Sequence, residues 1–269
     1  MNEGRGWVWG VVAVIAVLAI GGWVYWAHQR ALRETPPAVG IRAPVAATAP
    51  APTHYPVPAA PAAAGSAAAP LPALHDDAAI LSTLAQLPGG ETLRALMRPR
   101  QLIQHIVATI NALPGRTLGD GIVPVHRPRG GFLVDTRDGS TTISAANAAR
   151  YAPYMDAIRA VPAHALVAWY VRLYPLFQQA YQDLGYPHGY FNDRLVVVID
   201  NLLATPDRAT PPTLIPGSHG TWNYADPALQ GLSIGQRMLL RAGAGDEAAI
   251  KARLRAIRAQ LTAHGPRHR

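Results

Sequence analysis

The chain has 269 residues, no cysteine and a formal net charge of +8 at pH 7. The lack of cysteine excludes disulfides, thiolate metal sites and cysteine nucleophiles. Residues 76–264 have 18 basic and 14 acidic side chains with the signs interspersed, and this is not the basic surface of a nucleic-acid-binding protein, so we expect no nucleic-acid partner.

After a short N-terminal tail, residues 1–6, the sequence predicts one transmembrane helix at residues 7–26. The 20 residues from Trp7 to Trp26 contain no charged side chain, and a helix of that length spans about 30 Å, the thickness of the bilayer's hydrocarbon core. Aromatic residues stand at both ends of the segment, as in helices whose ends lie at the two interfaces. A cleaved signal peptide would end in small residues, whereas this segment ends in Trp-Val-Tyr-Trp. We therefore expect a retained anchor, with the lipid bilayer as a partner through Trp7–Trp26.

Residues 27–74 are predicted to be an Ala/Pro-rich, disordered linker. Residues 35–73 contain 15 alanines and 10 prolines, and no helix persists through proline at that density. A spacer of this composition could reach roughly 120 Å at about 3.1 Å per residue. The alternative is a neutral insertion that only links its neighbours. Such reach favours a domain that works away from the membrane, as in a bacterial periplasm.

The charges next to the apolar segment and the length of the following domain favour opposite orientations of the anchor. Arg5 precedes the apolar segment, while Arg30 and Arg33 follow it, and this local balance would place the following residues in the cytoplasm. However, long domains translocate largely regardless of such charges. We therefore expect a single-pass protein of a bacterial inner membrane, with its soluble domain in the periplasm.

Residues 75–264 are predicted to form a helical soluble domain, followed by a basic tail at 265–269. Apolar residues recur at helical spacing from Asp76 or Asp77 to 87, over 91–97 and over 99–113. Residues 147–150 and 153–160 read as two short helices. Phe132–Val134 and Thr141–Ile143 flank Asp138-Gly139, which is a signal for a β-hairpin turn.

A long helix is expected at 162–184, with a kink at Pro175 and a break at Gly185–Pro187. The next helix, 194–203, is apolar on nearly all sides, so we expect it to be buried and to pack against the long helix as an antiparallel pair. Residues 205–220 read as loop and 221–224 as a strand. Helices at 233–241 and 246–263 follow, the last one basic and exposed. The predicted fold is therefore mainly α: an irregular multi-helix bundle with one or two short β-hairpins, preceded by one transmembrane helix and a disordered linker.

Four segments together resemble the bacterial domain-of-unknown-function family 3014. They are YPLFQQAYQDLGYPHGYFNDRLVVVIDNLLATP, LPGGETLRALMRPRQLIQHIVATINALPGR, DGSTTISAANAARYAPYMDAI and WNYADPALQGLSIGQRMLLRAG. The resemblance extends over about residues 76–262. It implies a single-span envelope protein with one soluble domain, and it implies no activity.

The candidate chemistry gathers around the Gly185–Pro187 break. His188, Asp193 and Arg194 lie within seven residues, and a histidine, a carboxylate and a guanidinium together could do acid–base work or hold an anion. The alternative is structural: Asp193 would cap the following helix, Arg194 would pair with a carboxylate and His188 would be exposed. Asp200 falls within the predicted buried helix, where we expect a structural ion pair with Arg172.

Tyrosines and a tryptophan are concentrated between residues 151 and 191. A groove lined by Tyr174 and Tyr190, with Arg172 and Arg194 nearby, would suit a sugar or a peptide. The alternative is a helix-packing core with hydroxyl groups at the surface. The speculative ligand-binding set is thus Tyr174, Tyr190, His188, Asp193, Arg194 and Arg172.

The sequence nominates no catalytic residue, metal ligand or cofactor. Ser218-His219 lacks the context of a nucleophile elbow, Gly89-Gly90 is too little for a phosphate loop, and no histidine pair has metal-binding spacing with an acidic partner. We therefore expect a membrane-anchored periplasmic binding or scaffold module rather than an enzyme, with an envelope protein or cell-wall material as its partner. The alternative is an envelope enzyme that acts on cell-wall or peptide material through the His188/Asp193/Arg194 region.

Overall fold

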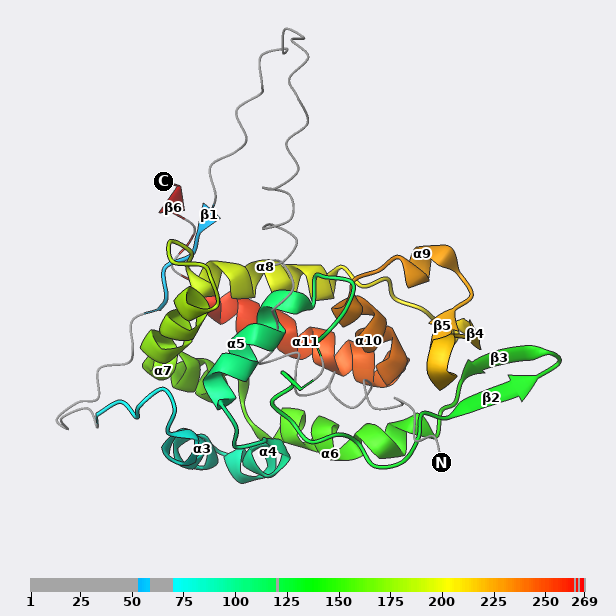
Figure 1. The fold of residues 1–269 in the computed structure, drawn as a ribbon, viewed down its shortest axis with the longest axis horizontal. Helices are drawn as coiled ribbons and strands as arrows, with labels where there is room; N and C mark the ends of the chain where they lie inside the picture. Colours follow the sequence, from blue (N-terminus) through cyan, green and yellow to red (C-terminus); the bar gives the residue numbers. More distant parts are fainter. Residues whose placement is uncertain (1–52, 59–69, 120, 264, 266, 269) are drawn as a thin grey trace, which may run out of the picture.

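The computed structural model describes residues 53–58, 70–119, 121–263, 265 and 267–268. Within them the fold is mainly helical with a small antiparallel sheet (Figure 1). The helices are α3 (Asp77–Ala85), α4 (Gly90–Leu96), α5 (Leu102–Ala112), α6 (Asn147–Ala160), α7 (Ala163–Asp183), α8 (Phe191–Leu203), η2 (Ser218–Gly220), α9 (Pro227–Gln230), α10 (Ile234–Ala242) and α11 (Ala244–Leu261). The strands are β1 (Thr53–His54), β2 (Val134–Arg137), β3 (Ser140–Ile143), β4 (Thr213–Pro216), β5 (Trp222–Tyr224) and β6 (Arg267–His268).

No helix within these described ranges has the length and apolarity to cross a membrane. The predicted anchor, Trp7–Trp26, lies outside the described residues, as does most of the predicted linker.

Helix α11 runs through the middle of the bundle, between α8 on one side and α6 on the other, and it also contacts α7 and α10 (Figure 1). Its apolar residues Ile250, Leu254, Ile257 and Leu261 are all buried, and their spacing places them along one side of the helix. The prediction of a basic, exposed final helix is therefore wrong. The three arginines of α11 lie off this stripe, and its one lysine, Lys251, is buried and paired with Glu247 and Asp207.

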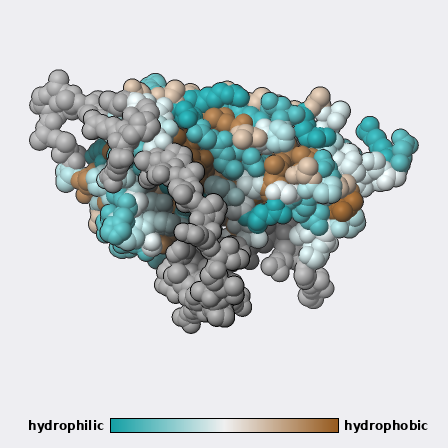
Figure 2. Space-filling view, turned by 90° about the horizontal axis from the view of Figure 1, so that it is seen from above, coloured by the Kyte–Doolittle hydropathy of each residue, from teal (hydrophilic) through white to brown (hydrophobic). Residues whose placement is uncertain are grey.

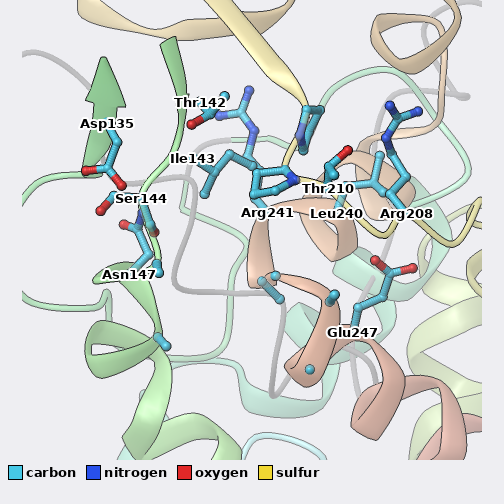
Figure 3. A pocket seen from close by; sticks show the side chains of 18 of the residues that line it. Asp135, Thr142, Ile143, Ser144, Asn147, Arg208, Thr210, Leu240, Arg241 and Glu247 are labelled. Atoms are coloured by element: carbon cyan, nitrogen blue, oxygen red, sulfur yellow. The ribbon is translucent and has the colours of Figure 1, made fainter. Parts of the chain in front are cut away.

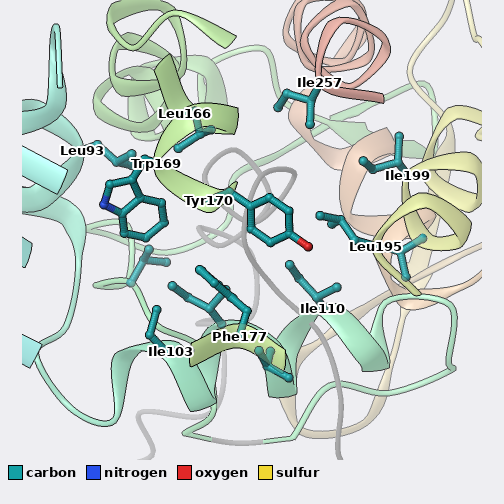
Figure 4. Close-up of a cluster of buried hydrophobic side chains, with 14 of the residues drawn as sticks. Leu93, Ile103, Ile110, Leu166, Trp169, Tyr170, Phe177, Leu195, Ile199 and Ile257 are labelled. Carbon is teal, nitrogen blue, oxygen red and sulfur yellow. The ribbon is translucent and has the colours of Figure 1, made fainter. Parts of the chain in front are cut away.

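The main core forms where α5, α7, α8 and α11 meet (Figure 4). Tyr170 and Phe177 of α7 lie close to Ile110 of α5 and Leu195 of α8, and all four side chains line one small internal space. Phe177 also stacks on Phe191, with ring centroids 5.8 Å apart. Full burial of each such side chain contributes on the order of 1.5–3 kcal/mol relative to exposure.

Helix α8 is less enclosed than the sequence suggested. Ile199 is 1% exposed, as predicted, but Val197 is 53% exposed and Asp200 is also exposed. Asp200 forms its ion pair with Arg258 of α11, at 2.9 Å between Nη2 and Oδ2, rather than with Arg172. The main partner of α8 is α11, and its contacts with α7 lie near its own start, so the predicted antiparallel α7–α8 pair is wrong.

The small sheet has the order β2-β3-β4-β5, with every pair antiparallel. The predicted hairpin is confirmed: Val134 pairs with Ile143, and Asp138 and Gly139 both have positive φ, of 50° and 74°. Such angles at both central residues are those of a type I′ turn. Strand β4 was missed because it lies in a Pro-rich stretch that read as loop.

A second, smaller core lies where this sheet meets α9 and α10, and it includes Ile143, Leu214, Tyr224 and Leu240. The predicted pair of short helices before α7 is one helix, α6, with Pro153 inside it. On the face of the molecule that carries α8 and α9, apolar residues lie in separate patches among hydrophilic ones (Figure 2).

Residues 53–58 correct the linker prediction for that segment. Thr53 and His54 form strand β1, which pairs with β6 near the C-terminal end of the chain (Figure 1). Tyr55 and Val57 are partly buried against the main core. A segment inside the predicted spacer therefore packs against the domain.

Candidate functional site

The start of α8 is held in place by one glutamine of α7. The amide nitrogen of Gln178 donates to the carbonyl of Gly189 at 2.7 Å, and its oxygen accepts the backbone N–H of Phe191 at 2.9 Å. The same oxygen accepts the hydroxyl of Tyr174 at 2.8 Å. The bond to Phe191 satisfies one of the backbone N–H groups that a helix start leaves unpaired. Together the bonds of Gln178 hold the start of α8, on which the next two residues stand.

Those two residues, Asn192 and Asp193, bind the segment at 53–55. The fully buried Asn192 donates from its amide nitrogen to the carbonyl of Tyr55 at 2.9 Å. Asp193 accepts the backbone N–H of Tyr55 at 2.7 Å, and its other carboxylate oxygen lies 3.0 Å from Nδ1 of His54. The ring of His54 rests against that of Tyr190, with centroids 4.2 Å apart. Asp193 is thus neither a helix cap nor part of an open acid–base site.

The structure brings some of the predicted ligand-binding residues together and separates others. Tyr190 and Asp193 both contact the 53–55 segment, and Tyr174 supports them through Gln178. Arg194 instead faces α5, where it donates to the carbonyl of Asn111 at 2.6 Å, and desolvation lowers its pKa. His188 and Arg172 are exposed, and neither hydrogen-bonds to Asp193 within the described part of the chain.

Burial also affects the tyrosines behind this site. It raises the pKa of Tyr174 to about 12 and that of Tyr170 well above its ordinary value. The hydroxyl of Tyr170 donates to the side-chain oxygen of Asn192 at 3.2 Å. Both tyrosines therefore stay protonated at neutral pH, and their hydroxyls act as donors that orient the residues at the start of α8.

A separate cavity of about 750 Å³ lies at the other end of the molecule, between the sheet and the α10–α11 junction (Figure 3). Its walls come from β2 and β3, from residues 143–148 at the start of α6, from the 208–212 loop and from residues 240–247. Asp135 and Asn147 lie on one side of it, and Arg208 and Glu247 on the other.

The α10–α11 junction gives the cavity its floor. Gly243 joins the two helices with φ of 89° and ψ of 155°, a conformation almost confined to glycine. This turn lets α11 begin directly after α10 ends. The next glycine, Gly245, lies in the first turn of α11, and a Cβ atom there would meet open space.

The charged groups on the floor of the cavity have protein partners. Arg241 donates to the carbonyl of Trp222 and lies over the rings of Phe132 and Tyr224, at 5.4 and 5.0 Å from their centroids. Glu247 forms an ion pair with Lys251 at 2.7 Å. Burial raises the pKa of Asp246, although Arg159 opposes the shift. No histidine is among the described residues that line the cavity, and no group of three or more acidic or histidine side chains in the described ranges could hold a metal ion.

Sequence reasoning missed this cavity and the bound segment. The signal for the cavity was Gly243-Ala244-Gly245 ahead of two acidic residues, at a predicted helix start. The signal for the segment was Tyr55, the single aromatic residue between residues 35 and 73. A lone aromatic side chain in an Ala/Pro-rich spacer indicates a segment that packs against a folded domain.

With the fold and both regions described, the comparison with protein families is informative. Residues 102–258 match the family described as "Protein of unknown function (DUF3014)". The chain belongs to the DUF3014 family. The match confirms the resemblance seen in the sequence, and it covers both the start of α8 and all the residues that line the cavity. No curated protein and no solved structure matches the chain. Because the DUF3014 description assigns no activity, the function must be argued from the geometry.

Proposed function

We propose that this DUF3014 protein is a membrane-anchored periplasmic binding module. The Trp7–Trp26 segment would hold it in the bacterial inner membrane, and the Ala/Pro-rich stretch would carry the domain away from the bilayer. The observation that supports binding is the cavity between the sheet and the α10–α11 junction. Its volume of about 750 Å³ falls within the range of small-molecule sites, about 300–1,000 Å³.

The lining of the cavity suits a small ligand with charges of both signs. Asp135 and Asp246 supply carboxylates, Arg137 and Arg208 supply guanidinium groups, and serine and threonine hydroxyls lie between them. Apolar side chains from the 208–212 loop and the helix junction complete the walls. A short zwitterionic peptide, of the kind that cell-wall turnover releases, matches this mixture of ammonium-binding, carboxylate-binding and apolar surface.

Several contacts favour binding over the alternative, an envelope enzyme acting through His188, Asp193 and Arg194. That chemistry would need the three side chains to converge on an open pocket. Instead, Asp193 accepts the backbone N–H of Tyr55, and Arg194 donates to Asn111. In the cavity, the buried Glu247 is paired with Lys251, so it is not poised to act as a base.

The test fills the cavity without disturbing the fold. Replacing Gly245 with Phe places a ring in open space on the floor of the cavity. The matched control is Ala248→Phe, because Ala248 lies one residue beyond the first turn of the same helix, is exposed and does not line the cavity. Calorimetry on the full chain in detergent, titrated with cell-wall peptide fragments, should show binding that Gly245→Phe weakens at least tenfold and Ala248→Phe leaves unchanged. Equal binding by both variants would refute the cavity as the ligand site.

A further inference from the structure

The contacts of Tyr55 have the form of peptide recognition. Both of its backbone polar groups are bonded to side chains of adjacent residues: its N–H to Asp193 at 2.7 Å and its C=O to Asn192 at 2.9 Å. A pair of bonds to one residue's main chain fixes an extended peptide in direction and register, whatever its side chains are.

The residues that make these two bonds are also held by contacts that do not involve the bound segment. Asn192 has no exposed surface, and the hydroxyl of Tyr170 fixes its side-chain oxygen, which leaves the amide nitrogen directed at Tyr55. Gln178 fixes the helix start on which both residues stand. If the segment leaves, the buried amide nitrogen of Asn192 loses its acceptor, and an unsatisfied buried donor costs free energy. This arrangement therefore favours an occupied site.

The side chains of the bound segment add specificity. Tyr55 and Val57 are partly buried against the main core, and the ring of His54 lies on that of Tyr190. Pro56 and Pro58 keep the segment extended, so little further ordering is needed when it binds. The site thus recognises an aromatic residue whose backbone N–H can donate to Asp193, followed by a proline and then an aliphatic residue.

We propose that the start of α8 is a binding site for an extended aromatic-Pro-aliphatic peptide, with Tyr55–Val57 as its resident, displaceable occupant. The strand pair that helps to hold the segment is only two residues long on each side. A segment of the same chain acts at an effective concentration of about millimolar, so a peptide added in trans competes poorly until the resident segment is released. This site is independent of the proposed cavity, because neither Asn192 nor Asp193, the two residues that form the backbone clamp, lines that cavity.

The test vacates the site and then offers the same peptide in trans. In the full chain, in detergent, the double substitution Tyr55→Ala/Val57→Ala removes the apolar contacts of the resident segment. A fluorescent peptide with the sequence of residues 52–59, PTHYPVPA, is then titrated and followed by polarisation. We expect the double variant to bind the peptide at least tenfold more tightly than the unmodified chain does. Equal affinity for the two proteins, or no binding to the vacated protein, would overturn the proposal.

The matched control changes only the peptide. A peptide methylated on the backbone nitrogen of its tyrosine keeps every side chain but loses the N–H that Asp193 accepts, so its affinity should fall at least tenfold. Asp193→Ala in the vacated protein should weaken the unmethylated peptide to the same degree and should be insensitive to the methyl group. If the methylated and unmethylated peptides bind the vacated protein equally, the backbone clamp is wrong. Gly245→Phe should leave peptide binding unchanged, which separates this site from the cavity.

Discussion

At the scale of single residues, Lys251 is a buried charge that is held by several partners. Its side chain is 2% exposed, and its ammonium lies 2.7 Å from Glu247, 2.6 Å from Asp207 and 2.6 Å from the carbonyl of Thr205. Burial alone would lower its pKa, but the hydrogen bonds to Asp207 and Glu247 outweigh burial and raise it. The buried side of α11 therefore carries a charged ammonium group, and its hydrogen bonds to Asp207 and Glu247 keep it charged.

Replacing Lys251 with Met should destabilise the domain strongly, because the buried carboxylate of Glu247 is left without its cation. Removing one partner of a buried pair costs about 3–5 kcal/mol. The double substitution Lys251→Met/Glu247→Leu should recover most of that loss, since it removes both charges. Urea denaturation of the three proteins measures the effect, and a single variant as stable as the unmodified chain would show that the pair is not buried in solution.

The buried tyrosines predict an alkaline limit to stability. Burial raises the pKa values of Tyr154 and Tyr224 to about 12, and each hydroxyl donates to a backbone carbonyl, of His126 and Arg237 respectively. An unfolded tyrosine loses its proton near pH 10. Between about pH 10 and 12 the folded state therefore binds more protons than the unfolded state, and the free energy of unfolding should fall as the pH rises.

Urea titrations at several pH values, read beside the ultraviolet absorbance of tyrosinate, test this expectation. Lys251 adds to the fall, because its raised pKa means that its stabilising charge is lost only as the pH rises through the folded-state value. A stability that stays constant from pH 9 to 12 would contradict the burial of these hydroxyls.

At the scale of elements, α8 and α11 form the centre of the domain, and neighbouring positions on α8 should behave differently. Ile199→Ala should cost on the order of 2–5 kcal/mol, because the side chain is 1% exposed and its loss leaves a cavity. Val197→Ala is the matched control on the same helix, and it should be nearly silent because Val197 is 53% exposed. Melting temperatures of the two variants measure the difference. Equal decreases in melting temperature would mean that α8 presents a different face to the core.

Arg258 of α11 is paired with Asp200 of α8. The bidentate ion pair joins α11 to α8 at the surface. Such exposed pairs contribute about 0–1 kcal/mol to stability. Arg258→Ala is thus a small perturbation beside Ile199→Ala.

Helical periodicity alone was enough to locate α5 and α7, because apolar residues recur at helical spacing along the whole length of each helix. The Asp138-Gly139 signal was enough to locate the β2–β3 hairpin. Strand β4 could not be recognised, because Thr213–Pro216 has neither alternation nor length and becomes a strand only by pairing with β3 and β5. The burial of α11 was hidden because its four core residues are outnumbered by Ala and Arg, and only its neighbours show which face turns inward.

At the scale of the whole molecule, the sequence located part of the candidate sites and not the rest. Tyr190 and Asp193 were proposed from local composition and do contact a bound segment. Their partner could not be found that way, because His54 and Asp193 are 139 residues apart in the chain. The cavity was hidden for the same reason, since its walls come from three separate stretches of sequence, 135–148, 208–212 and 240–247. Proximity of this kind is a property of the fold, and a local signal such as Tyr55 does not say which distant residues it will meet.

The proposal that the domain works outside the cytoplasm, at the end of a membrane anchor, is tested most directly by labelling single cysteines in whole cells. The chain has no cysteine of its own, so Ala149→Cys, at an exposed position of α6, gives one reactive thiol on the domain. Asn2→Cys places the matched thiol ahead of the apolar segment. In cells whose outer membrane alone is permeabilised, a membrane-impermeant maleimide should label Cys at position 149 at once and the one at position 2 only after lysis. Labelling in the reverse order, or recovery of the protein in the soluble fraction, would contradict the anchored periplasmic module.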